Sequence, residues 1–338
     1  MIMRTSTITE SDAVDVLVAA GFDVSVHPGQ RRGVDLLVSR DGETAVVQVK
    51  VRQKTIYEWD ALRLLDSADE RVLVVVPIAS RGLIDAAKRD GRLGVVSLGD
   101  RRLIWNREEI HSPDAIAETH ASVTVPGRRR NPWGRWAIMR AYLLNGEPRS
   151  QAELAKETGV TQSAVSKSNN ALDGLVVRSA SGWKATDRLA LWEAFMAEYV
   201  GPGGITTHWY GLDAVTDQSN SVVAAGASAG VQVIVSGDSA ADQLAPWRVP
   251  KRAVVYAASG IALGKLGFAQ TAEERATLTF TVPADRTIWA TAASWSERNN
   301  TLTADPVIAA WDVRRTGGPD ADEAVTRIRD LVLASERS

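Results

Sequence analysis

The chain has 338 residues, enough for two or three domains of roughly 100 to 150 residues each. Its 45% hydrophobic and 24% charged residues are typical of a globular protein, and no apolar run approaches the roughly 18 residues of a membrane span, so no membrane partner is expected. The sequence contains no cysteine, which excludes disulfides and thiol chemistry, and its four scattered histidines argue against a zinc site. The amino terminus lacks the apolar core of a signal peptide, which predicts a cytoplasmic protein.

Residues 1–112 alternate helix and strand patterns, which predicts an α/β domain. Helical periodicity covers residues 9–20, and a second helix is expected near residues 80–90. Apolar runs and alternating patterns predict strands at residues 34–38, 45–51, 72–76 and 94–98.

The stretch GVDLLVSRDGETAVVQVK, residues 33–50, is typical of a β-hairpin with a two-residue Asp-Gly turn. This turn sets a register in which Asp35 lies opposite Gln48. Lys50 is two residues further on and shares their face of the sheet, whereas the valines between them point to the other face. Hydrolysis of a phosphodiester with magnesium needs oxygen ligands and a cation that orients water or stabilises charge. Asp35, Gln48 and Lys50 are therefore a candidate catalytic site.

This pattern resembles the restriction-endonuclease-like superfamily, in which an Asp is followed by Glu or Gln, any residue, and Lys; the Gln-x-Lys form is closest to the Mrr-like branch. The resemblance implies a further helical acid, which falls on Glu10, and a metal held by Asp35 and Glu10. The amide of Gln48 removes one formal charge and should weaken magnesium binding. The structural alternatives are a capping box from Thr7 to Glu10, an ion pair between Asp35 and Lys50, and a solvated Gln48.

Residues 113–132 lose the apolar periodicity and are predicted to form an exposed basic linker. Arg128, Arg129 and Arg130 of this linker are candidate DNA contacts. Residues 126–190 contain eleven Lys/Arg and five Asp/Glu, a balance of +6, so the remainder of the chain totals −8 for the net charge of −2. This asymmetry predicts that the middle of the chain meets a polyanion.

Residues 133–199 are predicted to form a winged helix-turn-helix domain of three helices followed by a short hairpin. Ser150 and Glu153 are spaced for a capping box at the start of the second helix. Gly159 predicts a tight turn after it, and Thr161 opens the third helix. Two apolar residues of that helix, Val165 and a leucine seven positions later, would face the core.

The third helix is a candidate recognition helix because its outward face carries amides, hydroxyls and one lysine, groups suited to base edges and phosphates. The hairpin around residues 179–182 would follow it as a wing, with cations placed to touch the phosphate backbone. The alternative is a helical connector whose polar face is only solvated. The candidate DNA-binding residues of helix and wing are Gln162, Ser163, Ser166, Lys167, Asn170, Arg178 and Lys184.

Residues 200–338 begin at a Gly-Pro-Gly-Gly break and are predicted to form a strand-rich α/β domain. The stretches GPGGITTHWYGLD, SGDSAADQLAPWRVPKRAVVYA and TADPVIAAWDVRRTGGPDADEAVTRIRDLV resemble the carboxy-terminal part of AbiEi-like proteins, the antitoxin-type regulators of type IV toxin–antitoxin systems. With VPIASRGLIDAAKRDGRLGVVSLGD in the first domain, the resemblance spans most of the chain. It implies that this last domain has a nucleotidyltransferase-like fold.

An active nucleotidyltransferase needs a Gly-Ser turn followed by carboxylates that hold magnesium against a triphosphate. Here Asp238 interrupts the turn, and the strand expected to carry the acids, residues 253–256, contains none. A helix-capping role is expected for Asp238. The domain is therefore predicted to be non-catalytic.

These patterns predict an α/β multidomain protein with a restriction-endonuclease-like domain, a winged helix-turn-helix and a nucleotidyltransferase-like domain. The first hypothesis for its function is a sequence-specific transcriptional regulator of AbiEi-like antitoxin type that binds double-stranded DNA without a cofactor and is not an enzyme. The alternative is a Mg²⁺-dependent DNA endonuclease of Mrr-like type that uses Asp35, Gln48 and Lys50. The resemblance also implies a cognate toxin protein, and the two-fold symmetry common among DNA-binding regulators predicts a homodimer.

Overall fold

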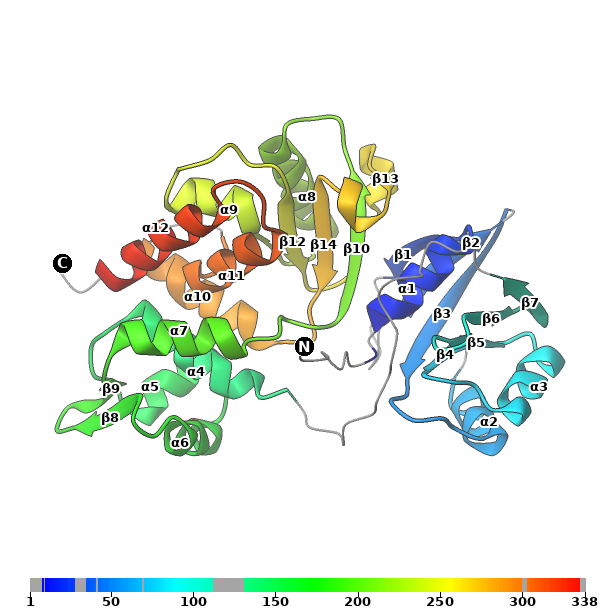
Figure 1. Ribbon diagram of the computed structural model, residues 1–338, viewed down its shortest axis with the longest axis horizontal. Coiled ribbons are helices and arrows are strands. Elements are labelled where there is room, and N and C mark those ends of the chain that lie inside the picture. The colour runs from blue at the N-terminus through cyan, green and yellow to red at the C-terminus, as the bar shows by residue number, and fades with distance from the viewer. Residues whose placement is uncertain are drawn as a thin grey trace. The chain divides into compact units, whose positions relative to one another are not determined.

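The computed structural model describes residues 8, 10–27, 35–40, 42–68, 70–111, 131–299 and 303–334 (Figure 1). The packing divides the described residues into two compact units: unit 1 comprises those of the first 130 residues together with residues 204–207 and 259–265, and unit 2 comprises those of residues 131–203, 208–258 and 266–338. The predicted linker contacts Arg128, Arg129 and Arg130 lie outside the described residues. The fold is mixed α/β, as predicted.

Unit 1 is built on a seven-stranded sheet whose strands lie in chain order from β1 to β7. The pairs β3–β4 and β4–β5 are parallel, and the other pairs are antiparallel. Its elements are α1 (Glu10–Ala19), β1 (Asp23–His27), β2 (Asp35–Arg40), β3 (Glu43–Val51), α2 (Glu58–Asp66), β4 (Arg71–Val76), α3 (Arg81–Arg89), β5 (Leu93–Ser97), β6 (Arg102–Trp105) and β7 (Glu108–His111).

The central strand β4 reads as a continuous apolar run because it is buried on both faces of the sheet. Val72 and Val74 belong to one core with Leu65 of α2 and Leu83 of α3, so these two helices cover one face of the sheet. Leu73 is also fully buried and, by strand alternation, fills the other face. The sheet is therefore the frame that positions the polar side chains of the neighbouring strands.

The two helices and four strands predicted in this region are present within two residues of their expected ends. Helix α2, strand β1 and the β6–β7 hairpin were not predicted. The hairpin turns at Asn106 and Arg107, whose φ angles are 49° and 71°. A turn with two positive φ angles usually contains glycine. This turn contains no glycine, so the sequence carries no signal for the hairpin.

Unit 2 contains a two-stranded ribbon, β8–β9, and a five-stranded sheet of order β11-β12-β14-β10-β13. Helix α7, which follows the ribbon, was not predicted. The helices are α4 (Trp133–Leu144), α5 (Gln151–Thr158), α6 (Gln162–Ala171), α7 (Arg188–Glu198), α8 (Val215–Ala229), α9 (Gly237–Leu244), α10 (Thr287–Asn299), α11 (Pro306–Thr316) and α12 (Ala321–Ala334). The strands are β8 (Val176–Ser179), β9 (Gly182–Ala185), β10 (Ile205–Tyr210), β11 (Val233–Ser236), β12 (Ala253–Ala257), β13 (Ala269–Gln270) and β14 (Leu278–Val282).

One hydrophobic core runs through the whole of unit 2, from α4 and α7 to α11, α12 and strand β12. Arg140 of α4 lies inside it without solvent exposure and donates to Asp305 at 3.0 Å and to Thr287 at 2.7 Å. Asp285 is the second carboxylate beside this guanidinium, at 3.8 Å. The predicted domain boundary at residues 199–200 falls inside this unit. Within the described residues of both units, no helix has the length and apolar character needed to cross a membrane.

Candidate nucleic-acid interface

Helices α5 and α6 have the local signals that the sequence predicted. The Ser150 backbone N–H donates to the Glu153 carboxylate at 2.7 Å, and the Glu153 N–H donates to the Ser150 hydroxyl at 3.2 Å, which completes the capping box. Gly159 ends α5 with a φ of 69°, in the left-handed region that glycine adopts without strain. Thr161 then caps α6 by accepting from the Ala164 N–H at 3.2 Å. These caps define a short helix–turn–helix.

The inner face of α6 is fixed to the core of unit 2. Val165 and Leu172 are buried, as predicted. Asn169 is also buried, and its side-chain oxygen accepts a hydrogen bond from the Tyr142 hydroxyl of α4 at 2.9 Å. Packing and this bond therefore set which side of α6 faces solvent.

The outer face of α6 presents the predicted recognition residues. Gln162, Ser163, Lys167 and Asn170 are exposed, and Ser166 is half-buried. Helical spacing places the residues at positions 163, 166, 167 and 170 along one row. Amide and hydroxyl groups in such a row can both donate and accept hydrogen bonds, which is what base edges require, and one lysine adds a phosphate contact.

The β8–β9 ribbon has a third short partner that the sequence did not reveal. Arg149, the residue before the α5 cap, exchanges two backbone hydrogen bonds with Trp183, at 2.9 and 2.8 Å. Gly182 makes room for this approach, since a Cβ atom there would come within 2.6 Å of the Arg149 backbone. The β8–β9 ribbon, which is the predicted wing, is thus anchored to the start of α5, and its position relative to α6 is fixed.

The Arg149 side chain reinforces the same anchor. It is almost fully buried, donates to the Glu157 carboxylate at 2.6 Å and donates to the Asn145 carbonyl at 2.6 Å. Its guanidinium also lies 5.6 Å from the centre of the Tyr142 ring. No local sequence pattern distinguishes this residue from an exposed arginine.

The two cations of the wing lie on opposite faces of the ribbon. Arg178 pairs with Trp183, and Lys184 pairs with Val177. Because paired residues share a face and neighbours alternate, Arg178 lies on the Trp183 side and Lys184 on the other. Both side chains are exposed. The two side chains can therefore contact phosphates on opposite sides of the ribbon, but they do not form a single row of cations.

The surface formed by α5, α6 and the β8–β9 ribbon carries less positive charge than the Lys and Arg content of residues 126–190 suggests. Arg140 and Arg149 are buried and paired with carboxylates of unit 2. Arg135 forms an ion pair with Glu198. The exposed cations that belong to α5, α6 and the wing are Lys156, Lys167, Arg178 and Lys184.

The nuclease-like hairpin of unit 1 has the predicted register. Asp35 pairs with Gln48 across β2 and β3, and the parallel strand β4 places Val72 beside Gln48 and Val74 beside Lys50. Gln48 and Lys50 are half-buried and share the sheet face of Val72 and Val74, which α2 and α3 cover. The side chain of Asp35 lies outside the described structure.

The amino-terminal start of α1 lies at the carboxyl end of β3. Gln53 accepts from the Ile8 backbone N–H at 3.1 Å and donates to the Ile8 carbonyl at 2.5 Å. These two hydrogen bonds fix the position of Ile8, two residues before Glu10, the first residue of α1. Among the described residues there is no cluster of three or more His, Asp or Glu side chains that could hold a metal ion.

The oxygen groups implied by the endonuclease resemblance suit Mg²⁺ in kind. Glu10 would be the carboxylate ligand from α1, and Asp35 the one from β2. Gln48 contributes an amide where the second strand of such a site commonly has a carboxylate, so the set is one charge weaker.

Asp238 of α9 has a structural role. Asp238 is buried, pairs with Arg248 at 2.5 Å and accepts from the Lys251 and Arg252 backbone N–H groups at 3.0 and 3.3 Å. The expectation that Asp238 caps a helix is wrong, because these bonds hold the loop after α9 instead. Strand β12 carries no acid and is buried throughout.

No family model, no curated protein and no solved structure matches this chain.

Proposed function

We propose that the protein is a sequence-specific DNA-binding transcriptional regulator of AbiEi-like antitoxin type that acts on double-stranded DNA through α5, α6 and the β8–β9 wing. The observation that carries this proposal is the fixed relation between the exposed face of α6 and the wing. Both elements are tied to one core, and the wing is bonded to the start of α5 through Arg149 and Trp183. A rigid helix and ribbon of this kind can present side chains to a groove and to the flanking phosphates without reordering.

The chemistry of the exposed face also supports DNA over a solvated connector. Ser163, Lys167 and Asn170 offer hydrogen-bonding groups and one positive charge, with no carboxylate in the row. An amide such as that of Asn170 can pair with the edge of adenine through two hydrogen bonds, and Lys167 can contact guanine or phosphate. Arg178 and Lys184 supply phosphate contacts on either side of the wing.

Fluorescence anisotropy with labelled double-stranded DNA tests the interface. Lys167→Ala and Arg178→Ala should each weaken binding and reduce the slope of log K against log[salt] by about 0.9, because each removes one phosphate contact. Lys265→Ala is the matched control, since Lys265 is an exposed lysine outside the interface. The control should bind as the unmodified protein does.

Unchanged affinity and salt slope in both interface variants at low salt would show that the DNA-binding face is misassigned.

Selection of bound fragments from genomic DNA would give the operator sequence. With that operator, a substitution at Asn170 should relax the preference at one base pair by about 1–3 kcal/mol. A palindromic operator bound with two chains, measured by sedimentation, would support the homodimer. The proposal also implies a cognate toxin protein as partner.

A second candidate function is supported by the register of the hairpin in unit 1. Asp35 and Gln48 are directly opposite, and Lys50 shares the face of Gln48, as a Mrr-like DNA endonuclease would require. Mg²⁺ bound there would activate the phosphodiester as a Lewis acid. Lys50 would stabilise the developing charge, and Glu10 would supply the carboxylate that Gln48 lacks.

Cleavage of supercoiled plasmid with Mg²⁺ or Mn²⁺ separates the two functions. An endonuclease should nick the plasmid, lose activity in Asp35→Ala and gain activity in Gln48→Glu, which restores the second carboxylate. Activity that persists in Asp35→Ala is contamination, and absence of cleavage in all three proteins leaves regulation as the function.

A further inference from the structure

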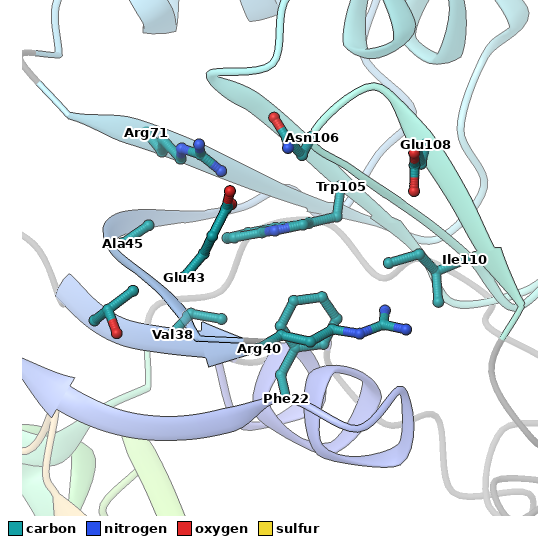
Figure 2. A pocket seen from close by; sticks show the side chains of 11 residues that line it. Phe22, Val38, Arg40, Glu43, Ala45, Arg71, Trp105, Asn106, Glu108 and Ile110 are labelled. Carbon is teal, nitrogen blue, oxygen red and sulfur yellow. The ribbon is translucent and has the colours of Figure 1, made fainter.

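The sheet of unit 1 contains a cavity that the proposed DNA interface does not use. It has a volume of about 330 Å³ (Figure 2). Residues of β2, β3, β4, β6 and β7 contribute to its walls, so strands that are far apart in the sheet order meet around one space. Its lining includes Phe22, Arg40, Glu43, Arg71, Trp105 and Glu108.

Two aromatic residues meet in the wall of this space. Phe22 precedes β1, Trp105 ends β6, and their rings meet edge to face with centroids 5.3 Å apart. Gly94 of β5 lies under the indole, since a Cβ atom there would come within 3.3 Å of Trp105 and 2.8 Å of Leu73. The absence of a side chain at Gly94 therefore lets Trp105 lie against the sheet.

A strained turn holds the rim of the cavity. Trp105 and Glu108 are paired across the β6–β7 hairpin, and the two residues between them both have positive φ. Arg107 has a φ of 71°, which is uncommon for a residue other than glycine and costs about 1–3 kcal/mol. Strain of this size is retained where a particular side-chain placement is needed, and here it places Trp105 opposite Glu108.

Charged groups surround the aromatic walls. The Arg71 guanidinium lies 5.6 Å from the Trp105 ring centre, and the Arg40 guanidinium lies 5.0 Å from the Phe22 ring centre. Figure 2 shows Glu43 reaching toward Trp105 and Arg71, with Arg40 on the opposite side of the indole. The cavity thus combines flat apolar surface, guanidinium donors and carboxylate acceptors.

We propose that this cavity is a binding site for a single nucleotide. Guanidinium groups bind phosphate in a fork that lysine cannot reproduce, and aromatic rings stack on a base. Glu43 and Glu108 can accept hydrogen bonds from the amino group of a base. Ligand pockets span roughly 300–1,000 Å³, so a cavity of about 330 Å³ is large enough for one nucleotide.

The site is separate from the other candidate sites and goes beyond the proposed regulatory function. On β3, Glu43 and Ala45 point to one face of the sheet, whereas Gln48 and Lys50 point to the other. On β4, Arg71 points to the same face as Glu43 and Ala45, because Arg71 pairs with Val47, which by alternation lies on that face of β3. A nucleotide in the cavity would therefore bind without occupying the nuclease-like face.

Isothermal titration of the full chain tests the site with AMP, GMP, CMP and UMP, with single-stranded d(A)10, and with tryptophan as an aromatic ligand that lacks phosphate. Arg71→Gln should weaken binding of a nucleotide probe at least tenfold. Trp105→Leu should also weaken it through loss of stacking. Arg81→Gln is the matched control, since the Arg81 side chain is 96% exposed and does not line the cavity. Thermal unfolding of each variant confirms that it is folded.

Binding of a mononucleotide or of the oligonucleotide that is lost in Arg71→Gln and kept in Arg81→Gln supports the site, and the tighter probe identifies free nucleotide or strand as the source. The proposal is overturned if no nucleotide probe binds. It is also overturned if Arg71→Gln binds as tightly as the unmodified chain, or if tryptophan is the only probe that binds.

Discussion

Asp312 of α11 lies in the interior of unit 2 without solvent exposure. One carboxylate oxygen accepts hydrogen bonds from the Ser236 and Tyr256 hydroxyls, both at 2.7 Å. The nearest cation is Arg315, whose Nε is 4.0 Å from the other oxygen. Burial raises the pKa of Asp312 above its usual value of 3.8, and Arg315 and the two hydroxyls only partly offset this effect.

The free energy of unfolding should therefore fall as pH rises from 3.8 through the raised pKa of Asp312. In this window the unfolded chain has released the proton and the folded chain still holds it, so the unfolded state binds fewer protons and the slope is negative. Asp312→Asn removes this contribution. Urea unfolding at several pH values should show the variant gaining stability relative to the unmodified chain as pH rises through the window.

Ser236→Ala is the companion variant, because the Ser236 hydroxyl lowers the pKa of Asp312. Its loss should extend the falling limb to higher pH. If Asp312→Asn and the unmodified chain keep the same stability difference at every pH, burial of this carboxyl does not control the pH dependence.

Sequence patterns were informative for single residues where alternation or helical spacing determines the direction of a side chain. The pairing of Asp35 with Gln48 followed from the turn length alone, and the exposure of Lys167 followed from the buried position of Val165. Whether an arginine is buried or exposed could not be predicted in the same way. Arg149 is buried by contacts with residues 142–157 and the wing, whereas Arg178 is exposed, and no local pattern separates them.

The wing is the element whose position depends most on one backbone conformation. Gly182 has a φ of 140°, and an added Cβ atom would come within 2.6 Å of the Arg149 backbone. Gly182→Ala should therefore break the backbone pairing of Arg149 with Trp183 and destabilise unit 2 by about 1–3 kcal/mol. Because the wing loses its anchor, affinity for DNA should fall by more than the change in stability alone explains.

Gly174→Ala is the control for this prediction. Gly174 has a φ of 82°, but no atom lies within 4 Å of an added Cβ. The change should cost about 1 kcal/mol through backbone strain and leave the affinity for DNA unchanged. Equal losses of affinity in the two variants, measured by anisotropy, would mean that the Arg149 contact does not position the wing.

End signals in the sequence located some elements, but other elements were missed even where such signals exist. The Ser150 capping box and Gly159 located α5 correctly, and the apolar run of β4 located a buried strand. Helix α7 was missed, although Asp187 caps it by accepting from the Leu189 and Ala190 N–H groups. The β6–β7 hairpin was missed because its turn has no glycine. The cavity at that hairpin was therefore not part of the predicted site.

At the scale of the whole molecule, the sequence could not reveal that residues 133–199 share a core with the carboxy-terminal region. The contacts join residues more than 100 positions apart. The Tyr199 and Trp311 rings meet edge to face with centroids 5.2 Å apart, and the Trp311 indole N–H donates to the Tyr199 carbonyl at 3.1 Å. Arg140 and Asp305 form a buried ion pair across the same junction. Such pairs leave no periodic signal in either segment.

This shared core predicts that the winged segment depends on the rest of unit 2. A fragment of residues 126–338 should unfold cooperatively and bind DNA, whereas a fragment of residues 126–200 should have no cooperative transition. The shorter fragment exposes apolar surface worth about 25 cal/mol per Å² and leaves Arg140 without Asp305. In the longer fragment, Arg140→Met should cost about 3–5 kcal/mol, because the buried carboxylates lose their cation. That loss is a large fraction of the roughly 5–15 kcal/mol by which a typical domain is stable.

Differential scanning calorimetry and anisotropy on the two fragments check this prediction, and both fragments retain the arginines at positions 128–130. If residues 126–200 unfold cooperatively with the same midpoint as the longer fragment, the winged segment is an independent domain and the core contacts are incidental. If only the longer fragment folds, any ligand or partner that changes the carboxy-terminal region acts on the same cooperative unit that presents α6 and the wing. Coupling between that region and DNA would then need no separate transmitting element.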